Sequence, residues 1–500
     1  MSTEKTLDPE DWEEIRQTFH QAVDQCIASM RDVRERPVWQ PVPERIKQEL
    51  CESAPAHGQP IQHLLTFFEE AILPYSTGNT HPCFFGWVHG SGNIAGVLGE
   101  MLAAFMNSNV GGRDHIAVYV ERQVLDWCKE IFSFPPGSSG ILTSGTSMGT
   151  LIALTVARNS RANADIQKLG LAALPKKLVG YTSREAHSCV VKTFELLGLG
   201  QDALRLVPAE SDYRMDVGRL ARMIQADRAD GFEPIVVIAS AGTVNTGAID
   251  PLDRIADLCR DQDLWMHVDA AFGGLAILTP EYHDRLAAIA RADSVAFDFH
   301  KWLHVPYDAG GVLLKDEQAH RKAFSVRREY LTTLPRGLAG GDPWFCEYGP
   351  ELSRGFRALK IWFTLQAYGI NRFADLIAQN CRQARYLGES ISANSDLELL
   401  ANVTLNIVCF RFFAPGRSDA ELDALNRDIV ADLQLQGIAA PSTTRIQGKT
   451  AIRVALTNHR TTQTDLDTLL AAVCRLGKSA LGVALGEHLA VRKEHTALAA

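Results

Sequence analysis

The ten cysteines of the sequence include no Cys-x-x-Cys pair, so we expect neither a disulfide framework nor a zinc site. No apolar run approaches the ~18 residues of a membrane span, and the polar, acidic start argues against a signal or transit peptide. A formal net charge of −9 argues against nucleic acid or an anionic membrane as a partner. The sequence therefore predicts a cytoplasmic protein without a bound metal.

The chain has 500 residues, of which 46% are hydrophobic and 22% charged, and it is long enough for two or three domains. Residues 9–35 and 43–73 have the periodicity of amphipathic helices, and a proline-rich break at 36–43 separates them. This segment has little that could form a core alone. We expect it to pack on another part of the protein or on a second subunit.

From about residue 95 to 320, short β-prone runs alternate with helical stretches. Strands are predicted at 140–144, 178–182, 234–239, 264–268, 294–297 and 310–314, and helices at 150–159, 187–198, 216–228 and 251–261. This alternation predicts an α/β fold with a mostly parallel sheet and helices on both faces. In such sheets ligands bind at the carboxyl ends of the strands.

Residues 328–350 are too rich in glycine and proline for a regular element, and a loop of this length in an enzyme is often a lid. A helix is predicted at 351–368, and strands at 404–412 and 450–456 indicate a small α+β domain. We therefore expect an N-terminal helical segment (1–95) and a large α/β domain with a mobile loop (96–350). A linking helix and a small C-terminal domain (351–500) would follow.

Two charged residues end predicted strands. Asp269 follows the strand at 264–268, and Lys301 follows the strand at 294–297. Pyridoxal phosphate requires a lysine that forms a Schiff base with its aldehyde, and a carboxylate that keeps its ring nitrogen protonated. Taken singly, an exposed lysine and a buried, capped aspartate are the simpler interpretations. Taken together, the two residues favour a pyridoxal-phosphate site.

The turn at 143–150 offers hydroxyl and amide groups at the start of a helix, where a phosphate can bind. A hydroxyl-rich capping turn has the same pattern. His187 ends a strand and opens a helix, so its imidazole could stack on a pyridine ring. A histidine that caps the helix explains this position equally well.

The same turn also fits a serine hydrolase. Residues 145–149 match Gly-x-Ser-x-Gly, the nucleophile elbow of α/β-hydrolases. Asp269 and His300 follow Ser147 in the order of that catalytic triad. This interpretation leaves Lys301 and His187 without a role, and the motif also arises by chance in glycine-rich chains. A Ser147 hydrolase is the alternative from another enzyme class.

Six short motifs occur in the order found in the group II pyridoxal-phosphate-dependent amino-acid decarboxylases. They lie at 81–85 (His-Pro-Cys-Phe-Phe), 143–150, 185–188 (Glu-Ala-His-Ser), 267–271 (His-Val-Asp-Ala-Ala), 298–302 (Asp-Phe-His-Lys-Trp) and 352–360. From about residue 40 to 480 the chain resembles this family, which includes the aromatic-amino-acid, glutamate and cysteine-sulfinate enzymes. Several motifs agree in order, so the resemblance is more specific than any one of them.

The resemblance implies a fold type I homodimer, with an N-terminal segment that wraps the partner. It implies α-decarboxylation of an L-amino acid to an amine, with pyridoxal 5'-phosphate as cofactor. Lys301 would bind the cofactor covalently, Asp269 would pair with its ring nitrogen, and His187 would stack on the ring. The other contacts would come from Gly145, Thr146, Ser147 and His300 at the phosphate, Ala271 beneath the ring and Thr243 near the cofactor hydroxyl.

In the aromatic decarboxylases a tyrosine of the mobile loop returns a proton to Cα. Counting back from residues 354–357, its place is taken here by Phe345, with Tyr348 three residues later. In related plant enzymes a phenylalanine at this place accompanies an oxygen-consuming decarboxylation that yields an aldehyde. A shift of the loop alignment would make Tyr348 the donor, and Phe345 would then only pack the closed loop. We predict simple decarboxylation, with aldehyde formation as the alternative.

The predicted substrate pocket is polar. Asn109, Arg113 and His115 lie in a stretch that resembles the Asn-x-Asn segment of the glutamate and cysteine-sulfinate branch. Such residues favour a substrate with a polar side chain, because an apolar one would leave them unpaired. They could instead bind the dimer partner. Trp87 and His89 follow the motif at 81–85, and the indole could still stack on an aromatic substrate.

Arg453 lies in the otherwise apolar strand predicted at 450–456. It takes the place of the small-domain arginine that meets the substrate carboxylate in the glutamate branch. Burying an arginine without an anion is unfavourable, and a salt bridge to a buried aspartate would explain it equally well.

Overall fold

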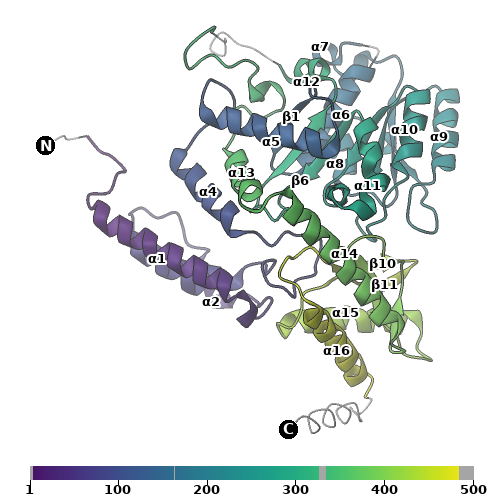
Figure 1. The fold of residues 1–500 in the computed structure, drawn as a ribbon. Coiled ribbons are helices and arrows are strands. Elements are labelled where there is room, and N and C mark those ends of the chain that lie inside the picture. The colour runs from purple at the N-terminus through teal and green to yellow at the C-terminus, as the bar shows by residue number, and fades with distance from the viewer. Residues whose placement is uncertain (1–3, 163, 326–333, 483–500) are drawn as a thin grey trace, which may run out of the picture.

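The computed structural model describes residues 4–162, 164–325 and 334–482, and its centre is a seven-stranded sheet (Figure 1). The strand order is β1-β7-β6-β5-β4-β2-β3, and all neighbours are parallel except the two pairs made by β7. The strands are β1 (Ser139–Thr143), β2 (Leu178–Ser183), β3 (Leu204–Val207), β4 (Glu233–Ser240), β5 (Trp265–Asp269), β6 (Ser294–Asp298) and β7 (Gly310–Leu314). The prediction of a mostly parallel sheet is confirmed.

The inner strands are continuous apolar runs, as expected where both faces of a sheet are covered. Every residue of β5, β6 and β7 is buried. Helix α6 (Thr146–Arg161) packs across β4 to β7, and Gly149 lets it approach closely, because a Cβ there would lie 3.1 Å from the Ala296 methyl. The edge strand β3 was not predicted, since two of its four residues are not buried.

Further helices of this domain are α5 (Ile116–Phe132), α8 (Cys189–Leu196), α9 (Val217–Ala229), α10 (Leu252–Asp261), α11 (Pro280–Leu286) and α12 (Glu317–Phe324). Helices α9 and α10 both pack on β4. The four helices predicted between residues 150 and 261 are all present, and α6 begins at Thr146, four residues earlier than predicted. The predicted lid falls partly on residues 326–333, which lie outside the described residues, and its mobility stays a prediction.

The C-terminal part forms a smaller antiparallel sheet in the order β10-β11-β9-β8. Its strands are β8 (Leu397–Leu399), β9 (Ile407–Phe412), β10 (Ser442–Ile446) and β11 (Lys449–Ala455), and its helices are α14 (Ile370–Ser392), α15 (Asp419–Leu435) and α16 (Gln463–Ala480). Val38, Phe84 and Phe85 of the N-terminal segment join its core. This segment therefore packs partly on the small domain of its own chain.

The N-terminal helices α1 (Trp12–Arg31), α2 (Glu44–Glu49) and α3 (Ile61–Phe67) precede α4 (Ile94–Met106), and α1 and α2 lie at one side of the molecule (Figure 1). The single helix predicted at 43–73 is wrong, because Pro55, Gly58 and Pro60 interrupt it. Helix α13 (Arg357–Tyr368) begins six residues later than predicted. Arg354, just before it, is buried in an ion pair with Glu121 and cannot belong to an exposed first turn.

Within the described ranges, no helix is long and apolar enough to cross a membrane. The same residues contain no group of three or more His, Cys, Asp or Glu side chains placed to hold a metal ion.

Candidate active site

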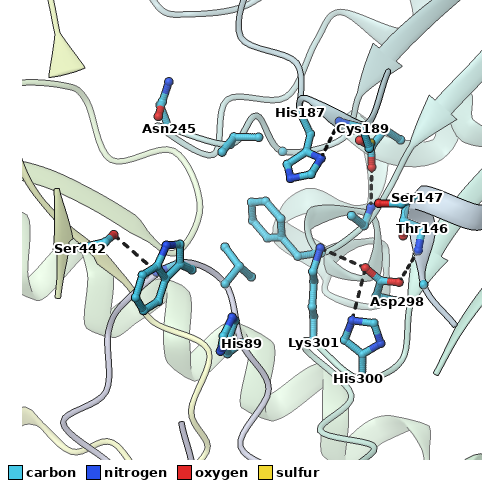
Figure 2. A pocket seen from close by; sticks show the side chains of 18 of the residues that line it. His89, Thr146, Ser147, His187, Cys189, Asn245, Asp298, His300, Lys301 and Ser442 are labelled. Carbon is cyan, nitrogen blue, oxygen red and sulfur yellow. Dashed lines mark hydrogen bonds and ion pairs between the residues drawn. The ribbon is translucent and has the colours of Figure 1, made fainter. Parts of the chain in front are cut away.

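A cavity of about 600 Å³ opens where β5 and β6 end, and the small domain closes it with residues of β10 and β11. Figure 2 shows Lys301 in this cavity, between His187, Ser147 and Thr146 on one side and His89 and Ser442 on the other. The predicted residues that line it are Trp87, His89, Gly145, Thr146, Ser147, His187, Asp269, Ala271, His300, Lys301 and Arg453. Thr243, Asn109, Phe345 and Tyr348 do not line it.

Lys301 is held by a carboxylate for which the sequence suggested no role. Its Nζ lies 3.0 Å from Oδ2 of Asp298, the last residue of β6. Burial by itself would lower the pKa of Lys301, but the carboxylates of Asp298 and Asp269 outweigh burial and raise the pKa. The amine is therefore charged when this ion pair is intact, and it must lose a proton before it can act as a nucleophile.

Asp269 ends β5, and its carboxylate is buried. Oδ1 accepts a hydrogen bond from the Ala271 amide at 3.1 Å. Burial raises the pKa of Asp269, and the positive charge of Lys301 opposes this rise. The buried carboxylate of Asp269 therefore favours a cationic partner. A positive charge in addition to that of Lys301 would stabilise the ionised form of the carboxylate.

His267, two residues earlier, fixes β5 in place. Its ring nitrogens contact the Ser294 hydroxyl at 2.9 Å and the Thr150 hydroxyl at 3.2 Å. Burial lowers the pKa of His267 to about 3, so the ring is neutral and connects β5, β6 and α6.

The start of α6 lies at the edge of the cavity and contacts Asp298. The Thr146 amide donates to Oδ1 of Asp298 at 2.7 Å, and the Thr146 hydroxyl is buried without a hydrogen-bond partner among the described residues. His300 accepts a hydrogen bond from the Ala309 amide through Nδ1 at 3.1 Å, and burial lowers its pKa. Gly310 of β7 allows this crowding, because a Cβ there would lie 2.5 Å from Cα of Gly145.

His187 both caps a helix and faces the cavity. Its Nδ1 accepts a hydrogen bond from the amide of Cys189, the first residue of α8, at 3.1 Å. Burial lowers the pKa of His187. This bond favours the capping interpretation, and the ring also lines the cavity (Figure 2), where stacking stays a prediction.

Thr243 lies outside the cavity and stabilises a turn. Its hydroxyl accepts from the Ala248 amide at 3.0 Å and contacts the Thr246 hydroxyl at 3.2 Å. Both bonds lie within the connection between β4 and α10, so a contact with a cofactor hydroxyl is not supported. Gly242 and Val244 on either side do line the cavity.

The polar stretch around Asn109 does not line the cavity of its own chain, so the structure does not support the predicted substrate contact there. The Asn109 side chain accepts hydrogen bonds from the amides of Gly111 at 2.9 Å and Arg354 at 3.0 Å. Arg113 lies over the Trp344 ring at 5.6 Å, and His115 contacts the Asn109 carbonyl at 3.1 Å. Asn109 and His115 thus bond to backbone groups, and Arg113 lies against an aromatic ring, so this stretch joins residues 109–115 to residues 344 and 354.

Phe345 and Tyr348 are both buried outside the cavity of their own chain. The Phe345 ring lies 5.1 Å from the guanidinium of Arg354. The Tyr348 hydroxyl donates to Glu317 at 2.6 Å, and its ring packs edge-on against His320. The structure therefore does not bring either predicted loop residue to Lys301 of the same chain.

Arg453 lines the cavity, but its guanidinium group hydrogen-bonds to backbone carbonyls. It donates to the carbonyls of Trp87 at 2.9 Å, Val244 at 2.6 Å and Asn245 at 3.3 Å. Burial lowers the pKa of Arg453. Three backbone carbonyls thus stabilise the charge in place of the buried aspartate, and a contact with a substrate carboxylate stays a prediction.

The serine hydrolase alternative is overturned by the orientation of its three residues. Among the described residues no hydrogen bond joins the Ser147 hydroxyl to His300. The Nε2 of His300 faces Asp298 at 3.7 Å, and Asp269 bonds to a backbone amide. A triad requires serine–histidine and histidine–aspartate hydrogen bonds, and the described residues make neither.

Comparison with known proteins identifies the family. Residues 43–413 match the pyridoxal-dependent decarboxylase conserved domain. The chain belongs to this decarboxylase family. It is 34% identical to the aromatic-L-amino-acid decarboxylase of Bacillus atrophaeus, over 91% of this chain and 93% of that protein. It is 30% identical to phenylacetaldehyde synthase of Petunia hybrida, over 82% and 81%.

Solved structures agree with this assignment. The crystal structure of Oryza sativa TDC with PLP and tryptamine superposes with a TM-score of 0.87 at 25% identity, covering 95% of this chain and 100% of that one. Mouse CSAD in its apo form gives 0.85 at 27% identity, with 93% and 98% covered. The decarboxylase therefore has the fold type I architecture, and it is a pyridoxal-phosphate-dependent carboxy-lyase.

The cavity fits this cofactor. Lys301 would supply the amine, and the buried carboxylate of Asp269 would suit a cationic ring nitrogen. The unpaired Thr146 hydroxyl at the start of α6 offers a donor where a phosphate is favoured. Asp298 is the member of the site that sequence reasoning missed. Its signal was a carboxylate at the very end of a buried strand, three residues before the lysine.

Proposed function

We propose that the decarboxylase removes the α-carboxylate of an aromatic L-amino acid and releases the corresponding amine and CO2. The observation that carries this proposal is the aromatic wall of the cavity. The ring of His89 stacks on Trp87 at 5.8 Å and meets Tyr307 edge-on at 5.9 Å. Such a wall favours a flat ring, because aromatic side chains gain both buried area and ring–ring contacts.

The expected preference for a polar side chain is replaced by this proposal. It rested on Asn109, Arg113 and His115, which do not line the cavity of their own chain. Polar groups remain at Asn245 and Thr444, which hydrogen-bond to each other at 2.6 Å across the two domains. They suit a ring hydroxyl or an indole nitrogen at the far end of a substrate. Relatives that include tryptophan and tyrosine decarboxylases support this class.

Pyridoxal phosphate, when bound, supplies an electron sink for the bonding pair that remains when CO2 leaves Cα. Lys301 would hold its aldehyde carbon, and the Asp269 carboxylate would keep its ring nitrogen protonated. His187 would lie against the ring, with Ala271 on the ring's other side. The start of α6, with Gly145, Thr146 and Ser147, would hold the phosphate together with His300.

Protonation of Cα decides the product, and a second candidate function follows from it. Phe345 holds the place where the resemblance expects a tyrosine donor, and a relative is a phenylacetaldehyde synthase. In the aldehyde-forming reaction, the amino acid, O2 and water give aldehyde, CO2, ammonia and peroxide. Phe345→Tyr would then raise the ratio of amine to aldehyde. Under simple decarboxylation the same variant forms only amine, as the wild type does.

We also propose that the decarboxylase is a homodimer. Large apolar side chains are exposed along one series of helices, among them Phe19 of α1, Phe105 of α4 and Ile116 of α5. Phe19 and Phe105 touch each other at 5.7 Å, so the exposed surface is continuous between α1 and α4. A monomer rarely exposes so much apolar surface. Light scattering of the purified protein tests this: Phe105→Glu should shift the mass from dimer to monomer.

A panel of amino acids tests the substrate class. We expect CO2 from L-tyrosine or L-tryptophan, and none from L-glutamate or cysteine sulfinate. Trp87→Ala should raise KM for the aromatic substrate ~10-fold, because one ring–ring contact is lost together with its buried area. Leu352→Ala, at an exposed position outside the cavity, is the control. A preference for the acidic amino acids would refute the aromatic assignment.

A further inference from the structure

A second cavity of about 390 Å³ lies between α1, the start of α4 and the start of α14. It shares no lining residue with the cavity around Lys301. One part of its lining is cationic or protonatable (Arg372, Arg460, His304 and His459), and another part is apolar.

Two of the three arginines that line this second cavity, Arg372 and Arg460, face no acid. Arg460 donates to the Ser91 carbonyl at 3.2 Å, and among the described residues Arg372 has no hydrogen bond or ion pair. Arg31, at the rim, is already paired with Asp32 at 2.7 Å. The described lining contains no aspartate or glutamate. A ligand carboxylate would therefore meet two guanidinium groups that lack an anionic partner.

His304 provides an independent sign of a ligand. The residue is 1% exposed, and its Nε2 is buried without a hydrogen-bond partner in the described structure. Its Nδ1 contacts the Ser91 hydroxyl at 3.2 Å. Burial, and then the charges of His459 and Arg460, lower its pKa, so the ring is neutral. With the Ser91 hydroxyl as donor, Nε2 carries the proton and can donate to a ligand oxygen.

The remaining walls are apolar and set the shape of the ligand. Ile27 and Met30 of α1, Ile94 of α4, and Phe373 and Leu376 of α14 line the cavity. A small inorganic anion would leave these walls without contacts. A cavity of this volume accommodates a small organic molecule.

We propose that this cavity binds an amphipathic monocarboxylate, whose carboxylate meets Arg372, Arg460 and His304 and whose aromatic or aliphatic body lies against α1 and α14. This proposal goes beyond the decarboxylase activity and does not depend on the substrate proposed above. The cavity is close to the reaction site along the chain, because the His304 amide donates to the Lys301 carbonyl at 3.2 Å. His459 contacts the Gly92 carbonyl at 3.2 Å, three residues from His89.

Titration calorimetry of the holoenzyme with phenylacetate tests the proposal. We expect binding that Arg372→Gln or Arg460→Gln weakens ~10-fold or more, because each removes a charge-assisted hydrogen bond. Arg382→Gln, an exposed arginine on the same helix but outside the cavity, is the matched control and should bind as wild type does. Trp87→Ala should also leave this affinity unchanged, since it alters only the cavity around Lys301.

Three results would overturn the proposal. In the first, phenylacetate does not bind, or Arg372→Gln binds it as tightly as the wild type does. In the second, Trp87→Ala abolishes binding, which would place the ligand in the reaction cavity. In the third, inorganic phosphate or benzyl alcohol binds as tightly as phenylacetate, which would remove the need for the apolar body or for the carboxylate.

Discussion

The ion pair between Glu121 and Arg354 is the buried interaction whose loss we expect to destabilise the decarboxylase most. Both side chains are fully buried, and the ion pair is bidentate. The two guanidinium nitrogens of Arg354 lie 2.5 and 3.2 Å from the two carboxylate oxygens of Glu121. Arg354 also donates to the carbonyls of Val110 at 2.9 Å and Leu142 at 2.7 Å. Leu142 lies in β1 directly before the turn that begins α6, so the pair supports the phosphate end of the site.

Glu121→Gln keeps the shape of the side chain but leaves the Arg354 charge buried and unpaired. Such a change costs ~3–5 kcal/mol, a large part of a total stability of ~5–15 kcal/mol. Replacing both residues by methionine removes the unpaired charge, but leaves two carbonyls without donors at ~1–3 kcal/mol each. We therefore expect the Glu121→Met/Arg354→Met double variant to lose less stability than the sum of Glu121→Met and Arg354→Met, by ~2 kcal/mol or more, because each single variant leaves the other charge unpaired.

Equilibrium urea unfolding of the wild type, the two single methionine variants and the double variant measures this coupling. Tryptophan fluorescence follows the unfolding, and Glu121→Gln is measured in the same way. Arg357→Gln is the matched control, since Arg357 stands in the same turn but pairs with the partly exposed Asp308 and Glu351. Its loss should cost ~1 kcal/mol or less. Additive single effects, or a Glu121→Gln protein within ~0.5 kcal/mol of wild type, would refute the reasoning.

Three further predictions concern the site. Lys301→Ala should yield a protein without the borohydride-reducible chromophore and without activity, and a retained covalent label would assign the amine to another lysine. In Asp298→Asn the pKa of Lys301 should fall, because its nearest carboxylate is lost. The apoenzyme should then take up pyridoxal phosphate at lower pH than wild type, and identical pH profiles of uptake would contradict this. The pKa of buried His267 is about 3, below the ~6.5 of an unfolded histidine. Stability present above about pH 6.5 is therefore lost as the pH falls toward 3, and His267→Gln should flatten the acid dependence of the urea midpoint. An unchanged dependence would exclude His267 as its source.

The sheet and the ends of its strands were predictable from the sequence, because buried parallel strands are continuous apolar runs with little ambiguity of type. Asp269 and Lys301 could be found for the same reason, since each follows such a run. Side chains whose partners are backbone groups were not predictable. Thr243, Asn109 and Arg453 all looked like ligand contacts. Thr243 instead holds its own turn, and the partners of Asn109 and Arg453 lie in loops that are distant in sequence.

The role of Asp298 was missed because it also depends on a contact between residues that are distant in sequence. Its contact with the Thr146 amide joins residues 152 positions apart, and no local pattern indicates it. The cavity for a carboxylate at Arg372 was equally hidden, because residues of α1, α4 and α14 form it together.

The most direct test of the account is the product balance of the holoenzyme with L-tyrosine and L-tryptophan. Carbon dioxide, amine, aldehyde, dissolved oxygen and peroxide would be followed together, with Lys301→Ala as the blank. The account predicts equal amounts of CO2 and amine from an aromatic substrate, with oxygen unchanged. Aldehyde with peroxide and falling oxygen would contradict simple decarboxylation in favour of the second candidate, and no CO2 from either substrate would contradict the aromatic assignment.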